Sequence, residues 1–589
     1  MVARPGRGPG TAITDLRAGA QPRCQMDTRA VSDTRAYGAR RIALGAAAVT
    51  ALVAVLALLA LQAGVVGLFH DDGIYVSVAR GLAEGHGYRL VDLPGDPLQT
   101  KYPFLYSGLL AVVWKVWPDF PANVMAMKLV GVAALAASTW LAIRWYGRRF
   151  GRDDPFALVF GLLVGAGATV LPYGNFTLTE LPFLAACLLA FAIADPASPH
   201  GEATRPADRR LAIALGLVVG AACLLRMAAA PLALGGLVIF LRGRRLGPLL
   251  WYVAVVGALV APWLAFKAWA PDPPSNPLLA YYTEYEPSVF ELAVRDGPGP
   301  ALGIVADNLW YVGWALDQAL MLPLAPWLRF LVYPIVILGL VRAARGPVGL
   351  AHWFAVVYLA LIVSWPFHPA RYALPLLPIM PLGLVVGVRE LWRLIEGAPR
   401  LAAQRAALRA VALAPVAIVL LLLSGWYLAF QNRSSGNLRL WSWGEIEYGF
   451  EGFEETFAWI RENTPPDVVL ASAFDPMYFL YTDRDAVRPW FHRPWTYFYP
   501  RGGASPRLGP ADEVQQALEE LGVRYLVVDP LRGFEEEEPA ADLFDALLAR
   551  YHGPEFPTPP VLRFTSADSL HRVYELPRRG EPASRPEGS

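Results

Sequence analysis

Cysteine and lysine are scarce in this chain of 589 residues. The three cysteines, Cys24, Cys187 and Cys223, lie far apart, so the sequence has neither a disulfide framework nor the ligand spacing of a zinc site. Only four of the 51 basic residues are lysine. The acidic residues number 50, and the formal net charge of +1 provides no basic field that would attract nucleic acid.

Charge of either sign is also sparse, at 17% of the residues, whereas 55% are hydrophobic and the mean hydropathy is +0.36. These values exclude a disordered chain and argue against a simple soluble enzyme. The hydrophobic residues lie in blocks, and the first block, residues 42–69, contains no charge. This block is too long for a signal-peptide core and no clear cleavage site follows it, so we interpret it as a retained transmembrane span.

Ten further blocks complete a prediction of eleven transmembrane helices within residues 42–430. These blocks are 124–143, 155–171, 178–194, 210–225, 227–241, 247–268, 325–341, 348–366, 372–388 and 409–430. Another block, 105–117, is too short to span and is interpreted as an interfacial or re-entrant helix at the outer face. Residues 1–41 are rich in Arg, Gly, Pro and Ala, which predicts a disordered cytoplasmic tail.

Arginine is concentrated in alternate connections between the blocks, whereas the long connection 270–324 contains Arg295 as its only basic residue. Because arginine and lysine favour cytoplasmic loops, this alternation predicts a multi-pass protein of the cell membrane, surrounded by lipids, with a cytoplasmic N-terminus. Residues 431–589 would then lie outside the cytoplasm. The arginine clusters are at 144–152, 205–210, 242–245, 342–345 and 389–409.

The composition changes after residue 430, where the apolar runs become short and turns rich in Pro, Gly and Asp separate them. Helical patterns that alternate with apolar strands predict an extracytoplasmic α/β domain over 431–589. The expected helices are 451–463 and 511–521, and the expected strands are 467–471, 523–528, 561–564 and 572–576. This part contains no phosphate-binding glycine loop, no metal-ligand spacing and no nucleophile elbow.

Two adjacent carboxylates, Asp71 and Asp72, directly follow the first block and begin a segment with helical spacing. Acids in this position could act as a general base or as metal ligands. The positive end of a helix dipole would also favour the charge of Asp71. The same pattern fits a helix N-cap followed by a surface acid, and the spacing alone does not separate the two interpretations.

Further outer connections carry Lys101, Glu180, His368 and Arg371. Lys101 and Arg371 could bind a phosphate at the depth of lipid headgroups, and a carboxylate at the membrane edge usually has a role. The alternatives are snorkelling cations, an aromatic anchor and a structural acid. Arg226, between the fifth and sixth spans, is a weaker candidate of the same kind. On the predicted topology these groups could meet at the outer leaflet, where they would suit a lipid phosphate.

Four short motifs occur in order on these connections: Asp71-Asp72 with Tyr75, Lys101-Tyr102-Pro103, Thr179-Glu180-Leu181-Pro182, and Arg371-Tyr372 followed by 374–378. In this order they resemble the polytopic GT-C glycosyltransferases that use polyprenyl-phosphate sugars. That family includes protein O-mannosyltransferases and the aminoarabinose transferases of lipid A. Asp72 departs from the commoner Glu, and Tyr102 replaces the first Pro of a Lys-Pro-Pro segment.

The resemblance implies inverting transfer of a sugar from a polyprenyl-phosphate donor to a glycan, lipid or protein acceptor. Asp71 would be the base, and Glu180 would shape the acceptor side. Asp72 would assist the reaction, or help Asp71 to hold a divalent cation such as Mg²⁺ or Mn²⁺, which some members need and others do not. The donor phosphate would be bound by Lys101, Arg371, His368 and Tyr75.

Two other functions compete with this interpretation. A transporter or flippase of a lipid-linked substrate would carry its charges near the bilayer midplane, whereas here they are predicted at the outer edge. A non-catalytic member of a membrane assembly would use the α/β domain as its interaction module, and its function would survive the loss of the Asp71 carboxylate.

Overall fold

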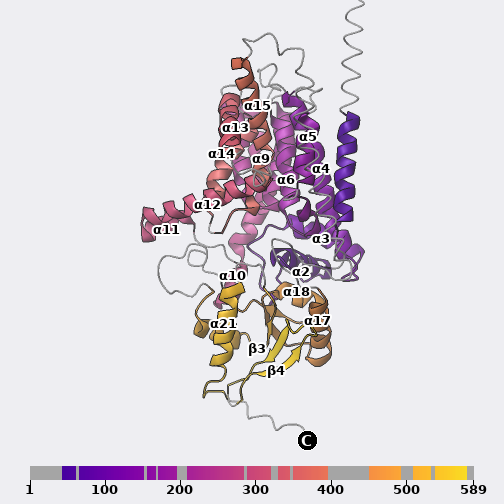
Figure 1. Ribbon diagram of the computed structural model, residues 1–589, viewed down its shortest axis with the longest axis vertical. Helices are drawn as coiled ribbons and strands as arrows, with labels where there is room; N and C mark the ends of the chain where they lie inside the picture. The colour runs from indigo at the N-terminus through magenta and orange to yellow at the C-terminus, as the bar shows by residue number, and fades with distance from the viewer. Residues whose placement is uncertain are drawn as a thin grey trace, which may run out of the picture.

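Two parts are visible in the computed structural model: a bundle of long helices, and a smaller α/β domain at one end of the bundle (Figure 1). The predicted tail 1–41 and the expected span 409–430 lie outside the described residues. The structure describes residues 43–61, 65–150, 156–167, 170–195, 208–283, 288–319, 329–344, 349–365, 367–395, 450–491, 508–531, 537–556 and 558–579.

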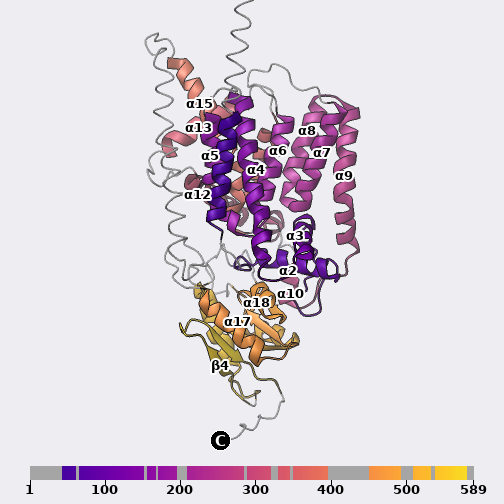
Figure 2. The ribbon, with the colours of Figure 1, turned by 90° about the vertical axis from the view of Figure 1, so that its right-hand side faces the viewer.

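The helices of the bundle follow the predicted apolar blocks (Figure 2). They are Ala43–Leu59, α4 (Val124–Phe150), α5 (Phe156–Ala166), α6 (Glu180–Ala194), α7 (Arg209–Leu225), α8 (Ala230–Arg242), α9 (Leu246–Trp269), α13 (Arg329–Ala344), α14 (Leu350–Val363) and α15 (Ile379–Ile395). Short 3-10 turns precede three of them: η1 (Leu171–Asn175), η2 (Met227–Ala229) and η5 (Arg371–Leu376). Among the described helices, α4 and α9 are long and apolar enough to cross a bilayer. The helical architecture is confirmed, and the count of eleven spans stays a prediction.

One bundle helix, α12 (Pro298–Ala319), lies in the segment 270–324, which the sequence analysis treated only as an outer connection. Its second half enters the core of the bundle through Leu316. Asp317 interrupts the apolar pattern of this half, but its carboxylate is buried and accepts a hydrogen bond from the Tyr333 hydroxyl of α13 (2.6 Å). Hydropathy did not predict this helix because a charged residue counts against a buried segment. The hydroxyl that allows Asp317 to be buried lies on another helix, which the local sequence does not show.

Four further helices are short, and three of them lie where the bundle meets the α/β domain (Figure 1). They are α2 (Asp71–Glu84), α3 (Leu105–Val116), α10 (Pro277–Thr283) and α11 (Val289–Asp296). α3 fills the block 105–117, so the short helix expected there is confirmed, and it packs against α2 through Tyr106 and Tyr75 (ring centroids 5.1 Å apart). α2, α3 and α10 form a layer between the bundle and the domain, whereas α11 packs on the start of α12 and projects to the side (Figure 1).

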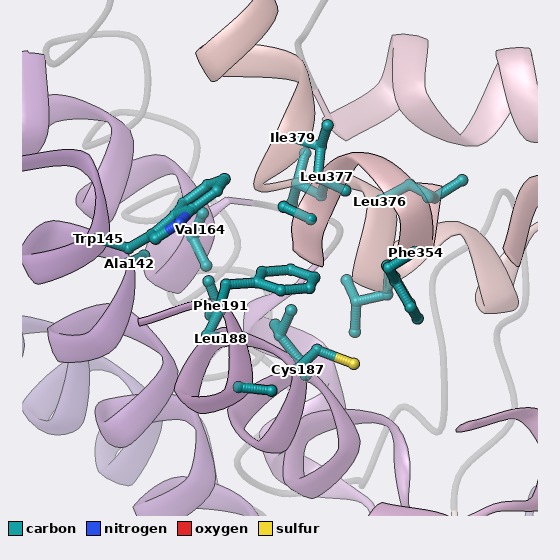
Figure 3. Packing of buried hydrophobic residues seen from close by; sticks show 14 of the residues in the cluster. Ala142, Trp145, Val164, Cys187, Leu188, Phe191, Phe354, Leu376, Leu377 and Ile379 are labelled. Carbon is teal, nitrogen blue, oxygen red and sulfur yellow. The ribbon is translucent and has the colours of Figure 1, made fainter. Parts of the chain in front are cut away.

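Aromatic rings link three helices in the core of the bundle (Figure 3). Phe191 of α6 lies between Trp145 of α4 and Phe354 of α14, with ring centroids 5.6 and 5.5 Å apart. Cys187 of α6 is buried in the same cluster as a free thiol. Close packing of such large rings fixes the helices relative to one another.

Arginine-rich helix ends gather at the end of the bundle away from the α/β domain (Figure 1). At the end of α4, Nη2 of Arg149 lies 2.9 Å from Oδ2 of Asp195. Arg389 of α15 donates a hydrogen bond to the carbonyl of Phe150 (3.2 Å). This grouping agrees with the prediction that the arginine-rich connections share one side. Which side faces the cytoplasm stays a prediction.

Glycines bring α13 and α15 into direct contact. A Cβ atom on Gly339 of α13 would lie 1.8 Å from the carbonyl oxygen of Gly383 on α15, and one on Gly387 would lie 2.0 Å from the carbonyl oxygen of Ile335. Gly383 and Gly387 are four residues apart and therefore lie on one face of α15. Small residues at this spacing allow helix backbones to approach closely in membrane proteins.

The α/β domain contains a five-stranded mixed sheet in the order β2-β1-β3-β5-β4. β1 runs parallel to β2 and β3, whereas β5 is antiparallel to β3 and β4. The predicted helices and strands are confirmed to within a few residues, whereas α18, β2 and α21 were not predicted. The elements are α17 (Glu451–Asn463), β1 (Val469–Ser472), α18 (Asp475–Thr482), β2 (Ala486–Val487), α20 (Ala511–Glu520), β3 (Val523–Val528), α21 (Glu537–Arg550), β4 (Val561–Thr565) and β5 (Arg572–Glu575).

Replacement of Gly339 by Ala should force α13 and α15 apart, because the added methyl group would overlap a backbone oxygen. We expect a loss of about 1–3 kcal/mol, the usual cost of overpacking. Thermal unfolding of the purified protein in detergent would measure it. The matched control is Gly257→Ala on α9, where a Cβ atom meets nothing within 4 Å. Equal melting temperatures for the two variants would contradict the packing argument.

Candidate active site

Asp71 is the first residue of α2, at the end of the bundle that meets the α/β domain. Its Oδ1 accepts a hydrogen bond from the Tyr102 hydroxyl (2.7 Å), and its Oδ2 is paired with the guanidinium of Arg371. The N-cap residue of α2 is His70, whose side chain makes no capping bond, and Asp72 is buried. The alternative of a capping acid followed by a surface acid therefore does not describe this turn.

Arg371 connects Asp71 to a second acid, Glu180 at the start of α6. Nε of Arg371 lies 3.8 Å from Oε1 of Glu180, and Nη1 of Arg226 lies 2.9 Å from the same oxygen. The sequence of contacts is thus Tyr102, Asp71, Arg371, Glu180 and Arg226. We refer to these five residues as the acid–arginine cluster. The chain brings together residues 300 positions apart to form it.

Exposure distinguishes the two ends of the acid–arginine cluster. The side chains of Arg371 and Asp71 are 30% and 16% exposed, whereas that of Glu180 is only 3% exposed. A substrate would therefore reach Asp71 and Arg371 first. Oε2 of Glu180 is buried and has no hydrogen-bond partner among the described residues. A buried oxygen of this kind is costly, so Glu180 is held in place by its arginine partners.

The charge of Arg371 dominates the state of the Asp71 carboxyl. Burial is the largest single effect and raises the pKa of Asp71. The charge of Arg371, together with His70 and the hydrogen bonds from Tyr102 and Arg371, more than offsets burial and holds this pKa well below its usual range. Asp71 is therefore ionised, as a base must be. It is also a weak base for as long as Arg371 is its partner.

Asp72 has a different environment from Asp71. Its two carboxylate oxygens accept hydrogen bonds from the backbone N–H groups of Gly67 (2.9 Å) and Phe69 (2.8 Å). Burial raises the pKa of Asp72 to about 6, and these two hydrogen bonds and the charge of Lys128 oppose the rise. The contacts of Asp72 hold the chain that leads into α2.

Tyr75 lies next to the acid–arginine cluster. Its ring centroid is 5.2 Å from that of Tyr102, and its hydroxyl shares a hydrogen bond with Thr179, the residue before Glu180. The hydroxyl of Tyr372 accepts a hydrogen bond from Nη2 of Arg371 (3.1 Å). Tyrosines therefore border the two arginine–carboxylate contacts and restrict the orientation of the side chains.

The structure places the other two predicted phosphate-binding residues differently. Lys101 is buried, and its Nζ donates a hydrogen bond to the carbonyl of Tyr281 in α10 (2.7 Å). It is nevertheless the neighbour of Tyr102 in the chain, so its backbone is fixed beside Asp71. His368 stacks on Tyr311 of α12, with ring centroids 3.9 Å apart.

A cation site at Asp71 and Asp72 does not fit the donor set. The oxygens of Asp71 are bound by Tyr102 and Arg371, whereas those of Asp72 are bound by backbone N–H groups. The described part of the chain contains no group of three or more His, Cys, Asp or Glu side chains that could hold a metal ion. We therefore derive no step of the reaction through a metal.

One member of the acid–arginine cluster, Tyr102, was not among the predicted site residues, and another, Arg226, was only a weaker candidate. A signal existed for each of them in the sequence. Tyr102 stands inside the Lys-Tyr-Pro segment, where it replaces a proline of the pattern, and Arg226 interrupts two short apolar blocks. The position of Arg226 in the sequence does not show that it pairs with Glu180, because that contact depends on the packing of α6 against α7.

No family model and no curated protein matches the sequence, but solved structures do. ArnT from Cupriavidus metallidurans bound to undecaprenyl phosphate has a TM-score of 0.51 at 15% identity, over 90% of this chain and 97% of that chain. The apo state of ArnT has a TM-score of 0.48 at the same identity and coverage. The archaeal oligosaccharyltransferase AglB from Archaeoglobus fulgidus, in complex with an inhibitory peptide and a dolichol-phosphate, has a TM-score of 0.48 at 10% identity, over 92% and 75% of the two chains.

The first of these matches extends over nearly the whole of both chains, the helical bundle and the α/β domain included. At 15% identity it shows a shared fold and leaves the activity open. This chain shares the fold of ArnT, and the resemblance inferred from the four motifs is confirmed at the level of the fold.

Proposed function

We propose that this protein is a membrane glycosyltransferase that moves a sugar from a polyprenyl-phosphate donor to an extracytoplasmic acceptor, with inversion at the anomeric carbon. The observation that carries the proposal is the pairing of Asp71 with Arg371 at the partly exposed end of the acid–arginine cluster. A carboxylate and a guanidinium side by side supply a proton acceptor and a phosphate ligand at one place. The match to ArnT bound to undecaprenyl phosphate supports the same donor class.

In the proposed reaction, Asp71 accepts the proton of an acceptor hydroxyl as its oxygen bonds to the anomeric carbon. The bond from that carbon to the phosphate oxygen breaks, and polyprenyl phosphate leaves. The phosphate gains one negative charge in this step, from a diester to a monoester. A cation beside it therefore stabilises the transition state more than the bound donor, which is the requirement for catalysis. Arg371 is placed for this role.

Donor binding would also activate the base. Arg371 has Asp71 as its present partner. When Arg371 turns toward the donor phosphate, its positive charge moves away from Asp71. The pKa of Asp71 then rises, and the carboxylate becomes a stronger base. The base would thus gain strength only when a donor is present. Glu180 would lie on the acceptor side of the cluster. With Arg226 it would keep Arg371 within reach of both Asp71 and the donor phosphate.

Lys101 would supply a second cation for the phosphate. In the present arrangement its ammonium group is bound to the carbonyl of Tyr281. The same Nζ lies 4.3 Å from the centroid of the Tyr281 ring. A backbone carbonyl and an aromatic ring are weaker partners than a phosphate for this charge. We place His368 and Tyr75 at the border of the donor site, as the resemblance implies.

The proposed topology follows from the location of the site. Lipid-linked donors are held in a bilayer, so the bundle would span the cell membrane with the α/β domain on the extracytoplasmic side. The arginine-rich end of the bundle would face the cytoplasm, together with the N-terminus. The acceptor would be a glycan, a lipid or a protein of the cell envelope. A transporter is less well supported, because the acid–arginine cluster lies at one end of the bundle.

The substitution Asp71→Asn should lower the rate of transfer by about 10²–10⁴-fold, the usual contribution of a general base. The assay uses the purified protein in nanodiscs, a panel of polyprenyl-phosphate sugars and membrane extract as the acceptor source, and measures released polyprenyl phosphate. Arg371 loses its charged partner in this variant, so some fall in the melting temperature is expected. A circular dichroism spectrum that matches the wild type would exclude misfolding. Full activity of this variant would show that Asp71 is not the base, whereas a wild type that releases nothing from any donor would favour a non-catalytic assembly protein.

The substitution Arg371→Lys should weaken the binding of undecaprenyl phosphate by about 10- to 100-fold, because a charged hydrogen bond contributes about 1.5–3 kcal/mol and lysine lacks the planar fork of arginine. Binding to protein in nanodiscs would be measured by titration. The control is Arg295→Lys on α11, at a side chain that is 64% exposed and paired with its neighbour Asp296. Equal affinity of both variants and the wild type would remove Arg371 from the phosphate site.

The substitution Asp72→Asn should affect stability more than catalysis. An amide offers one oxygen where the carboxylate offers two, so one of the N–H groups of Gly67 and Phe69 would face a donor instead of an acceptor. We expect a loss of about 1–3 kcal/mol and a change in the rate of less than tenfold. Thermal unfolding and the transfer assay would measure the two effects. A rate as low as that of Asp71→Asn, with an unchanged melting temperature, would show that Asp72 acts in catalysis.

A further inference from the structure

The α/β domain touches the chain segment that carries Asp71. A Cβ atom on Gly67 would lie 2.7 Å from Cβ of Met477, and one on Gly73 would lie 2.5 Å from Cβ of Pro476. Met477 and Pro476 belong to the first turn of α18. Gly67 has a φ of +99°, a conformation that glycine adopts most readily. The backbone on both sides of Asp71 therefore lies directly against the domain.

His70 connects Asp71 to this contact. It is the residue before Asp71, and its φ of +58° is uncommon for a side chain with a Cβ atom. The imidazole is buried, and its Nδ1 lies 3.2 Å from Oδ1 of Asp475, the first residue of α18. A costly backbone conformation persists where the surroundings hold it, and here a buried residue of the α/β domain is among them.

Asp475 has a second contact that leads to Lys101. Its Oδ2 accepts a hydrogen bond from the hydroxyl of Tyr282 in α10 (2.7 Å). The preceding residue, Tyr281, provides the carbonyl that accepts a hydrogen bond from Lys101. α10 is also tied to the domain through Asn276, whose side chain donates to the carbonyl of Ala517 (3.0 Å). Asp475 thus fixes the helix against which the donor-binding lysine rests.

Asp475 is itself fully buried: its Oδ2 accepts the hydrogen bond of Tyr282, whereas its Oδ1 makes close polar contacts that are not hydrogen bonds. Besides His70 and Tyr282, the guanidinium of Arg488 lies near it, with Nε 3.7 Å from Oδ1. The backbone N–H of Arg488 donates to the Tyr282 hydroxyl (3.2 Å), which leaves that hydroxyl free to donate its own proton to Asp475. One carboxylate therefore joins three segments: the turn before Asp71, helix α10, and the chain after β2.

We propose that Asp475 of the α/β domain is a positioning residue for the transfer reaction, acting on Asp71 through His70 and on Lys101 through Tyr282 and α10. The inference rests on the proposed function. It assigns the domain a part in the chemistry, because a small displacement of a base or of a phosphate ligand can lower a rate by up to about 100-fold. Asp475 does not itself touch the acid–arginine cluster.

The test uses the full-length protein in nanodiscs and the same assay of released polyprenyl phosphate. Asp475→Asn should lower kcat by at least tenfold and raise the donor KM, because both arms of the contact are disturbed. His70→Asn should lower kcat and leave the donor KM unchanged, since it affects only the arm to Asp71. Asparagine tolerates a positive φ, so this variant retains the backbone. The kcat of the double variant should be about the same as that of Asp475→Asn, because effects transmitted along one path do not multiply.

Two controls separate positioning from damage to the fold. Asp529→Asn replaces another buried carboxylate of the domain, bound by Ser472, Tyr478 and His571. Asp483→Asn removes a different contact between the domain and α2, the pair with Arg80 (2.6 Å). Both should retain kcat within about twofold. Equal losses for Asp475→Asn and either control would reduce Asp475 to a structural residue.

The two proposals fail in different ways. An active wild type with an unchanged kcat for Asp475→Asn would overturn the positioning role and leave the transferase intact. A wild type that releases no polyprenyl phosphate from any donor would overturn the proposed function, and the positioning role with it. The split between kcat and donor KM in the His70 and Asp475 variants is the result that a purely structural residue would not give.

Discussion

The contact between Asp71 and Arg371 organises the site, because the other contacts either orient one of these two side chains or balance its charge. Arg371 also lies near Glu180, which in turn needs Arg226, and Asp71 is held by the Tyr102 hydroxyl. Charges taken out of water are costly unless they are paired. The pairing is therefore a condition for placing these four ionised groups at the edge of an apolar bundle.

The pairing with Arg371 stabilises the charge of Asp71 but keeps Asp71 a weak base. Arg371 satisfies Asp71 and at the same time depresses its basicity. A ligand that competes for Arg371 must carry a negative charge and fit a planar donor, which describes a phosphate. In the proposed reaction, the interaction that stabilises these two charges is thus also the one that would select the donor and delay activation of the base until the donor arrives.

The sequence predicted the features that depend on local patterns. Hydropathy blocks located most helices of the bundle, and alternating patterns located α17 and β3 to the residue. Among the site residues, Asp71, Glu180 and Arg371 were found because ionisable groups at helix ends are conspicuous in an apolar chain. Features that depend on distant partners were missed. Tyr102 was treated as a departure from a motif, α12 was hidden by its buried Asp317, and the contact of Asp475 with His70 crosses two domains.

The contacts of Asp475 connect the α/β domain to the geometry of the candidate site. From sequence, the domain could have been an independent module attached behind the last span. The structure instead places its buried carboxylate against the residue next to Asp71 and against the helix that binds Lys101. A domain that only recruited an acceptor would need no polar contact with the turn that carries the base. Because this contact is buried and joins three segments, the geometry of the site depends on the docked domain, and the acid and the lysine would be aligned only in the complete protein.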